Sequence, residues 1–565
     1  MTFFKILVLA VCILAVPGAV TAATPKDVPE TQILDQLDST IANPLVKRVQ
    51  QALIDAGYYS GDADGRMNED TIAAIRKYQA RESLVIDGIA SEALVGHMET
   101  SIKVQSLLNK LQQSRELNIK MAREALLSSP ETKDLLNGED DRVANPSRDV
   151  ASCFAIPSPE CLLAEAVESA KAIGKEELRD WAFGEILVAQ AKAGMVDEAL
   201  ASVRRMGDPR LILLALRDIA KSLADAGRPA EALAAVAIIP SLLKQAEALA
   251  DIAAIQLKRG NAAGARIAAE RLIDALGQVE DTLKPIELVT RAAVILYKAG
   301  DETAAMAELT RMEALANGNP SAYRYIAGAL AEMSKTEQAL AMLEKVPEPS
   351  EHTAVLVMAA TAQANAGNAA LAISTASHIE GERYRAVVLG RIAVAEAKDG
   401  QTDMAEDTIN LALAATEKIK LPFARAYAYD RIALALTEIG KIGNSEAFEL
   451  AMVSAAQISD NKLRAHRLWS IAAARRALGH TAQAETVETE AAEATEMIKS
   501  KLTQAWMFTE IALERLAEGQ TGQARTVLAE AIAISKTITN AWARARALAR
   551  LASTLIEVPG PDEKE

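Results

Sequence analysis

The sequence predicts an all-α protein, with a small three-helix domain near the N-terminus followed by an α-solenoid, which is a stack of two-helix hairpins. Glycines recur at intervals of 33 to 40 residues between Gly194 and Gly519, and small residues flank most of them at fixed distances. Half of the 565 residues are hydrophobic but only 4% are aromatic. This composition is typical of helical repeats built from alanine and leucine.

The first 23 residues have the composition of a signal peptide. Met1–Lys5 is weakly basic, Ile6–Val16 is apolar, and Val20–Ala23 offers small residues for cleavage. The apolar run is short for a bilayer span, so we expect cleavage, a secreted, periplasmic protein, and no membrane span afterwards. An uncleaved membrane anchor is the alternative. Residues 24–42 are then an N-terminal linker.

Residues 43–98 have the turn pattern of a compact three-helix domain. Gly57 can end the first helix in a left-handed conformation, and Asp64-Gly65 is a turn. Asn68 can cap a helix over residues 69–81. Asp87-Gly88 then forms a second turn before the third helix.

This segment resembles the peptidoglycan-binding domain family, a three-helix module found in many cell-wall hydrolases and envelope proteins. The resemblance implies binding to the glycan or to the stem peptide of the wall polymer. Its departures are Asn68, where the family usually has glycine, and Tyr78, where phenylalanine is common. The matching positions are Val49-Gln50, Leu53, Gly57-Tyr58-Tyr59, Gly61, Asp64-Gly65, Thr71, Ala74-Ile75, Tyr78-Gln79, Leu84, Asp87-Gly88 and Leu94.

The candidate peptidoglycan-binding residues are aromatic or polar side chains in this segment. Sugar faces stack on exposed aromatic rings, and their hydroxyls and amides pair with carboxylates or amides. The alternatives are that Tyr58 and Tyr78 fill the core and that Asp64 only forms a turn. The candidates are Tyr58, Tyr59, Asp64, Tyr78 and Gln79.

Residues 99–127 continue as a long amphipathic helix. Its apolar side chains include Leu108, Leu111 and Met121. We expect them to pack against a neighbour in the same chain; a dimerising coiled coil is the alternative. Residues 128–152 are polar and rich in proline, asparagine and aspartate, which predicts a flexible linker.

Two cysteines remain once the signal peptide is removed. An even number of cysteines in an exported chain indicates a disulfide, here between Cys153 and Cys161. The bridge would close a short loop ahead of a helix that Ser158 caps and Pro159 opens. Two independent thiols are the alternative.

Residues 153–558 carry the repeat. Five residues after most turns and seven residues before them lies an alanine, so two helices can approach closely on either side of each turn. The phase of small residue, turn and small residue resembles tetratricopeptide repeats, although most of that family's aromatic and proline positions are missing. A single hairpin cannot bury its apolar face, so the hairpins must stack. The predicted turn residues are Gly194, Gly227, Gly260, Gly300, Ser334, Gly367, Gly400, Gly440, Gly479 and Gly519.

The last helical segment, Asn540–Val558, keeps the pattern of a first helix but has no second helix after it. We interpret it as a cap that ends the solenoid, with residues 559–565 as a polar tail.

Charge and motifs limit the possible functions. The net charge of −15 argues against nucleic acids and anionic membranes as partners. The sequence has no hydrolase, metalloprotease or phosphate-binding motif, and its five histidines are scattered, so we expect no enzyme, metal or cofactor.

The sequence therefore predicts an exported, non-catalytic adaptor that binds peptidoglycan through residues 43–98 and an unknown protein partner through its repeats. One alternative is an envelope or secretion scaffold whose small domain binds protein. The other is a regulator of a cell-wall hydrolase.

Overall fold

The computed structural model describes residues 42–136, 138, 143–145, 147, 150–277 and 283–559. These residues form helices and no strand, which confirms the all-α prediction. They divide near residue 118 into two compact units, which we call the head and the ring. The predicted signal peptide, and all but one residue each of the predicted N-terminal linker and tail, lie outside the described residues.

The head is built from α2 (Pro44–Asp55), α3 (Glu69–Arg81) and the first part of α4 (Glu92–Ser128). Asn68 caps α3 as predicted, because its side chain accepts a hydrogen bond from the backbone N–H of Thr71. The chain turns between helices at glycines with positive φ, among them Gly57 at 76°. The largest buried side chains of the head include Leu53, Ile75, Tyr78, Leu94, Val95 and Met98.

Helix α4 combines the third helix of the head with the predicted helix 99–127, and its middle is exposed. Leu108, Leu111 and Met121 are 53–58% exposed, so the expectation that they pack within the chain is wrong. Only the two ends of α4 are buried: Met98 lies in the core of the head, and Leu126 lies in the core of the ring.

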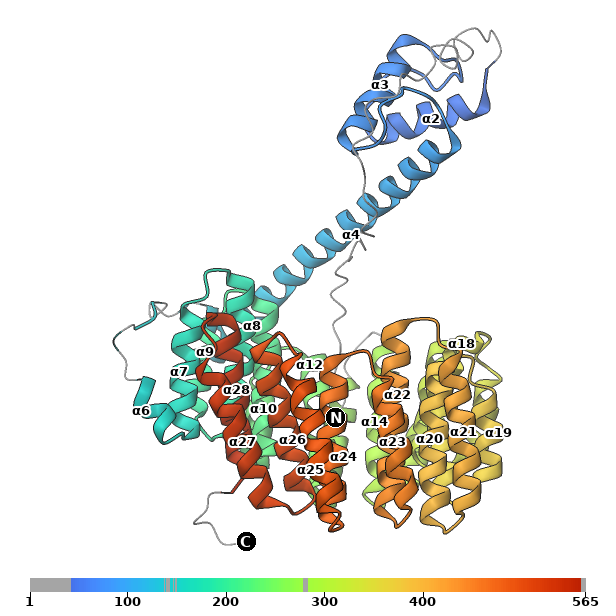
Figure 1. Cartoon of the computed structure of the whole chain (residues 1–565). Helices are drawn as coiled ribbons and strands as arrows, with labels where there is room; N and C mark the ends of the chain where they lie inside the picture. Colours follow the sequence, from blue (N-terminus) through green and yellow to red (C-terminus); the bar gives the residue numbers. More distant parts are fainter. Residues whose placement is uncertain are drawn as a thin grey trace. The chain divides into compact units, whose positions relative to one another are not determined.

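The ring consists of helical hairpins in two layers (Figure 1). The inner helices pack against one another in succession, whereas each outer helix packs mainly against its hairpin partner and the next inner helix. A curved wall brings helices closest together on its concave side, which identifies the inner layer. The inner helices are α8 (Glu176–Lys192), α10 (Pro209–Asp225), α12 (Leu242–Lys258), α14 (Leu283–Lys298), α16 (Pro320–Glu332), α18 (Pro349–Asn365), α20 (Glu382–Lys398), α22 (Pro422–Lys441), α24 (Asn461–Ala477), α26 (Lys501–Ala517) and α28 (Ala541–Glu557).

The outer helices differ in length, and this explains the two repeat spacings. Outer helices of about nine residues occur where successive turns are 33 residues apart, and those near sixteen residues occur in most of the 40-residue repeats. The added seven residues are two helical turns, which keep the same face toward the core. The outer helices are α7 (Pro159–Lys171), α9 (Val196–Arg204), α11 (Pro229–Ala237), α13 (Ala262–Leu276), α15 (Glu302–Ala316), α17 (Thr336–Leu343), α19 (Ala369–Ser377), α21 (Thr402–Glu417), α23 (Ser445–Ala456), α25 (Thr481–Glu496) and α27 (Thr521–Lys536).

The turn residues agree with the repeat pattern at all predicted positions but one. Nine of the ten have positive φ, including Ser334 at 61°, where the repeat uses a serine in place of glycine. Gly440 is the exception, because it lies inside α22, and the turn occurs three residues later at Gly443. Gly440 instead allows close packing on Phe448, since a Cβ atom at this position would lie 2.8 Å from the phenylalanine ring.

The repeats close on themselves, which corrects the interpretation of the last helix as a terminal cap. Helix α28 packs against α7 as extensively as the two helices of a single hairpin, and it also packs against the inner helix α8 (Figure 1). Helix α7 is therefore the missing second helix of α28, contributed from the other end of the repeat region. The solenoid is a ring whose closing hairpin is formed by residues from both ends.

The closing contact, which we call the seam, is rich in charge and aromatic groups. Arg546 of α28 forms hydrogen bonds of 2.6–3.0 Å with the carboxylate of Glu185 on α8. Its guanidinium lies 4.4 Å from the ring centroids of both Trp506 and Trp542 and 5.7 Å from that of Trp181. Three of the four tryptophans in the chain thus surround one arginine, where ring faces attract a cation.

A short segment ahead of α7 covers part of the seam. Helix α6 (Val150–Ala155) is joined to α7 by a disulfide between Cys153 and Cys161, whose Cα atoms are 5.7 Å apart. Ser158 caps α7, and Pro159 is its first residue. Phe154 is buried, and its ring lies 5.5 Å from the guanidinium of Arg544.

Part of the predicted linker 128–152 is packed. Residues Pro130–Lys133 form α5, and Asp134–Leu136 form the 3₁₀ helix η1. Thr132 and Leu135 are buried, and the hydroxyl of Thr132 donates to the carbonyl of Leu126 over 2.8 Å. A contiguous flexible linker is therefore wrong for residues 130–136.

Candidate functional site

Two buried glutamines organise the turns of the head. The side chain of Gln50 accepts a hydrogen bond from the backbone N–H of Gly65 over 2.7 Å and donates to Asp64 over 3.1 Å. Gln79 makes the same pair of bonds with Gly88 and Asp87, at 3.0 Å and 2.7 Å. Each aspartate also accepts the backbone N–H two residues later.

This duplicated arrangement gives two of the predicted site residues a structural role. Gln79 is only 4% exposed, and both atoms of its amide bond within the domain. Asp64 accepts from the backbone of Arg66 and from Gln50, and these bonds lower the pKa of its carboxyl group. Neither side chain offers an unused group to a ligand as readily as the tyrosines do.

Tyr59 belongs to the loop between α2 and α3. Its hydroxyl accepts a hydrogen bond of 3.4 Å from the side chain of Asn68. Its ring covers Gly61, where a Cβ atom would lie 2.6 Å from the tyrosine hydroxyl. Tyr59 is half-buried and is held at the loop that it shields.

Tyr58 and Tyr78 lie together at one surface of the head. Their rings meet edge to face with centroids 5.3 Å apart. Tyr78 is 2% exposed, and burial raises the pKa of its phenol. Its hydroxyl lies 2.8 Å from Nδ1 of His97, so only the polar tip of Tyr78 approaches the surface.

Two further residues complete this surface, which we call the Tyr58 cluster: Tyr58, Tyr78, Arg81 and His97. The guanidinium of Arg81 lies 5.9 Å from the ring centroid of Tyr58, and Arg81 and His97 are both exposed. The cluster thus offers a half-buried aromatic ring beside hydrogen-bond donors, an arrangement suited to a sugar face or a carboxylate. Sequence reasoning missed Arg81 and His97. Arg81 follows Tyr78 by three residues on α3, and that helical spacing could have identified it.

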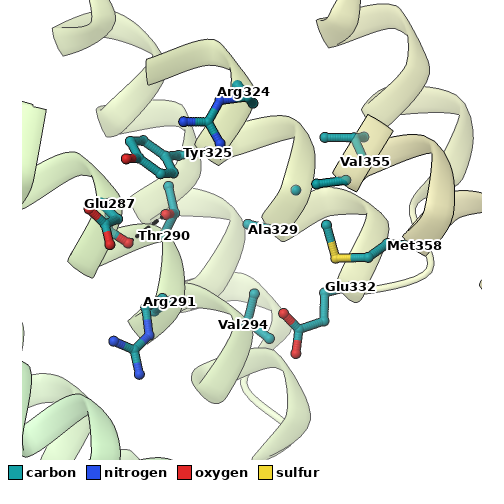
Figure 2. Close-up of a pocket in the computed structure, with 12 residues that line it drawn as sticks. Glu287, Thr290, Arg291, Val294, Arg324, Tyr325, Ala329, Glu332, Val355 and Met358 are labelled. Carbon is teal, nitrogen blue, oxygen red and sulfur yellow. Dashed lines mark hydrogen bonds between the residues drawn. The ribbon is translucent and has the colours of Figure 1, made fainter. Parts of the chain in front are cut away.

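The ring has a hollow on its inner wall between α14, α16 and α18 (Figure 2). Its volume is about 250 Å³, and its apolar lining includes Val294, Val355 and Met358. The floor is low because Gly328 and Ala329 lie there; among the inner helices only α16 has a glycine six residues before the turn.

Charged and aromatic groups surround the apolar floor of this hollow, which we call the inner groove. Arg324 and Tyr325 lie at one end and Glu332 at the other (Figure 2). Arg291 is 3.1 Å from Asp251, and Glu332 is 2.6 Å from Lys298, so these charges are paired across repeats. Such partly exposed pairs are weak and can exchange partners with a ligand.

Within the described ranges, no group of three or more histidine, cysteine or acidic side chains could hold a metal ion. No helix in the same ranges has the length and apolar character needed to cross a membrane.

Comparison with known protein families agrees with the geometry of the head. Residues 42–98 match the family model described as "Putative peptidoglycan binding domain". The match includes α2, α3 and the start of α4, and so contains the whole Tyr58 cluster. A search of curated proteins found no match to the chain.

Proposed function

We propose that the protein is an exported, non-catalytic adaptor that binds peptidoglycan through the head and a protein partner through the inner groove of the ring. The family match over residues 42–98 carries the first half of this proposal. The Tyr58 cluster supports it, because it combines an aromatic ring with exposed donors that can reach carbonyl or carboxylate groups of the wall polymer. The mixed apolar and charged lining of the inner groove supports the second half.

Replacing Arg81 with glutamate is expected to weaken binding to the cell wall by at least about tenfold, because it places a carboxylate where we expect a donor for the polymer. The measurement is co-sedimentation of the full chain with purified sacculi over a range of sacculus concentrations. Arg81 is exposed, so the head should remain folded.

The matched control is Lys47→Glu, the same charge change at an exposed position of α2. It should bind as the unchanged chain does. Equal loss in both variants would show that binding depends only on net charge, and failure of the unchanged chain to sediment would contradict the assignment of the head.

Filling the inner groove is expected to reduce partner capture. Gly328→Leu adds a side chain on the floor, and the nearest atom to a Cβ there is Cε of Met358 at 3.4 Å, so the helix can accept the change. We expect several-fold less protein captured through a photo-crosslinker at Thr290, which lines the groove.

Gly184→Leu is the control, since Gly184 lies in the inner helix α8 with open space around it. Its capture pattern should match that of the unchanged ring. The same captured proteins at unchanged yield in Gly328→Leu would place the partner site elsewhere.

A further inference from the structure

The middle of α4 carries an exposed apolar stripe. Every residue from Lys103 to Asn118 is exposed. Val104, Leu107, Leu108 and Leu111 are 51–58% exposed, and their spacing of three, four and seven residues places them on one face of the helix.

A single helix of this length without tertiary contacts is marginally stable in water, since most helix stability in proteins comes from packing of an apolar face. The charged and amide side chains that surround the stripe bond within the helix, as in Gln112 with Glu116 and Lys120 with Glu124. The stripe therefore has the features of a surface that is covered by another helix.

We propose that the stripe pairs with the same stripe of a second copy of this chain, in a parallel two-stranded coiled coil. Val104, Leu111 and Asn118 occupy one core position of successive heptads, and Leu107, Ser114 and Met121 occupy the other. A β-branched residue at the first position with leucine at the second favours two parallel strands.

Asn118 makes a second copy the fitting partner. A lone asparagine at the first core position of a coiled coil is tolerated when it meets an asparagine of the other strand, and only in-register pairing of two identical helices supplies one. The same polar residue lowers the affinity while it fixes the register.

The charges beside the stripe make the association weak. Lys103 and Lys110 precede the first core positions, and Arg115 follows a second one, so Lys110 faces Arg115 of the other copy. Because this repulsion is screened by salt while apolar burial is not, dimerisation strengthens as ionic strength rises. An association driven by ion pairs would show the opposite dependence.

Sedimentation velocity of the full chain at micromolar concentrations tests the proposal. The unchanged chain is expected to dimerise reversibly, and more strongly at high salt. Leu107→Glu combined with Leu111→Glu should weaken dimerisation by about 100-fold or more, since it places four carboxylates in the shared core. Both residues are exposed in the isolated chain, so its circular dichroism should not change.

The control is Gln105→Glu combined with Gln112→Glu, the same charge change one residue after each first core position and on the exposed side of the helix. It should dimerise within a few-fold of the unchanged chain. A monomeric unchanged chain, or equal dimerisation of all three proteins, overturns the proposal.

Cysteine crosslinking tests the parallel register. Ser114→Cys is a core position that meets its own counterpart, so mild oxidation should give a covalent dimer. Glu116→Cys lies on the outer face and should give none. The reverse result, or equal crosslinking of both, excludes the parallel pairing. These experiments do not involve the cell wall, so their outcome is independent of the proposed function.

Discussion

Replacing Arg546 with alanine is expected to lower the free energy of unfolding of the ring by about 3 kcal/mol, because it leaves Glu185 without its partner at the seam. The Arg546 side chain is 10% exposed and the Glu185 side chain 31%, so solvent only partly compensates the loss. The guanidinium also lies between Trp506 and Trp542, and its removal leaves space that the two rings must fill. Denaturant titration measures the effect.

The location of the change can be followed by hydrogen exchange. Opening of the seam should raise exchange in α7 and α28 together, although these helices lie at opposite ends of the repeat region, and should leave helices across the ring less affected. Arg550→Ala is the control on the same helix, since the one hydrogen bond of Arg550 to Thr509 is long, at 3.4 Å. It should cost about 0.5 kcal/mol. A loss in Arg546→Ala no larger than in this control would mean that the polar seam does not hold the ring closed.

Replacing Gln50 with alanine is expected to unfold the head at physiological temperature. The fully buried amide of Gln50 bonds to the N–H of Gly65, the carboxylate of Asp64, the carbonyl of Arg66 and the hydroxyl of Thr71. Its loss leaves a cavity and several unsatisfied groups, at a cost of about 3 kcal/mol or more. A domain of this size has a total stability of roughly 3–9 kcal/mol.

The measurement is hydrogen exchange of peptides from residues 42–98 in the full chain, with ring peptides as the internal reference. Gln51→Ala is the neighbouring control, since Gln51 is exposed and bonds only to Asp55 one turn later. It should change the stability of the head by about 0.5 kcal/mol. Sacculus binding should be lost in Gln50→Ala and kept in Gln51→Ala. Protection of the head in both variants would show that the glutamine contacts are dispensable.

Much of the fold could be predicted because it depends on local geometry. A glycine with positive φ is needed wherever an inner helix turns into an outer one, and this requirement appears directly in the sequence at Gly194 and its equivalents. The caps at Asn68 and Ser158 follow from side chains that reach only three residues ahead. Gly440 was misplaced because α22 continues through it to Lys441, and glycine spacing alone cannot distinguish a turn from a close contact inside a helix.

Closure of the ring could not be derived from periodicity, because Arg546 and Glu185 are 361 residues apart. One signal was present: α7 has no inner helix before it in the repeat, and α28 has no outer helix after it, so the two are complementary halves. The exposed middle of α4 was missed for a related reason. An amphipathic pattern shows that a face is apolar, but it does not show what covers that face.

The candidate site in the head was only partly predictable. The aromatic and polar residues were chosen by type, and type does not separate Tyr78, which is buried, from Tyr58, which is half-buried. The repeated order of a glutamine followed by Asp-Gly, at Gln50 with Asp64 and at Gln79 with Asp87, could have shown that these residues share one structural role.

Because the repeats begin and end in one hairpin, any tension between the N-terminal part of the chain and whatever the ring holds enters the ring at α7. An open spring of hairpins would distribute such a load along its length. Here the load first meets the joint where α28 and α7 were never linked by a turn, and the Cys153–Cys161 bridge fastens the covering segment at that point. Mechanical strength is thereby concentrated at a single, covalently reinforced place on the circumference.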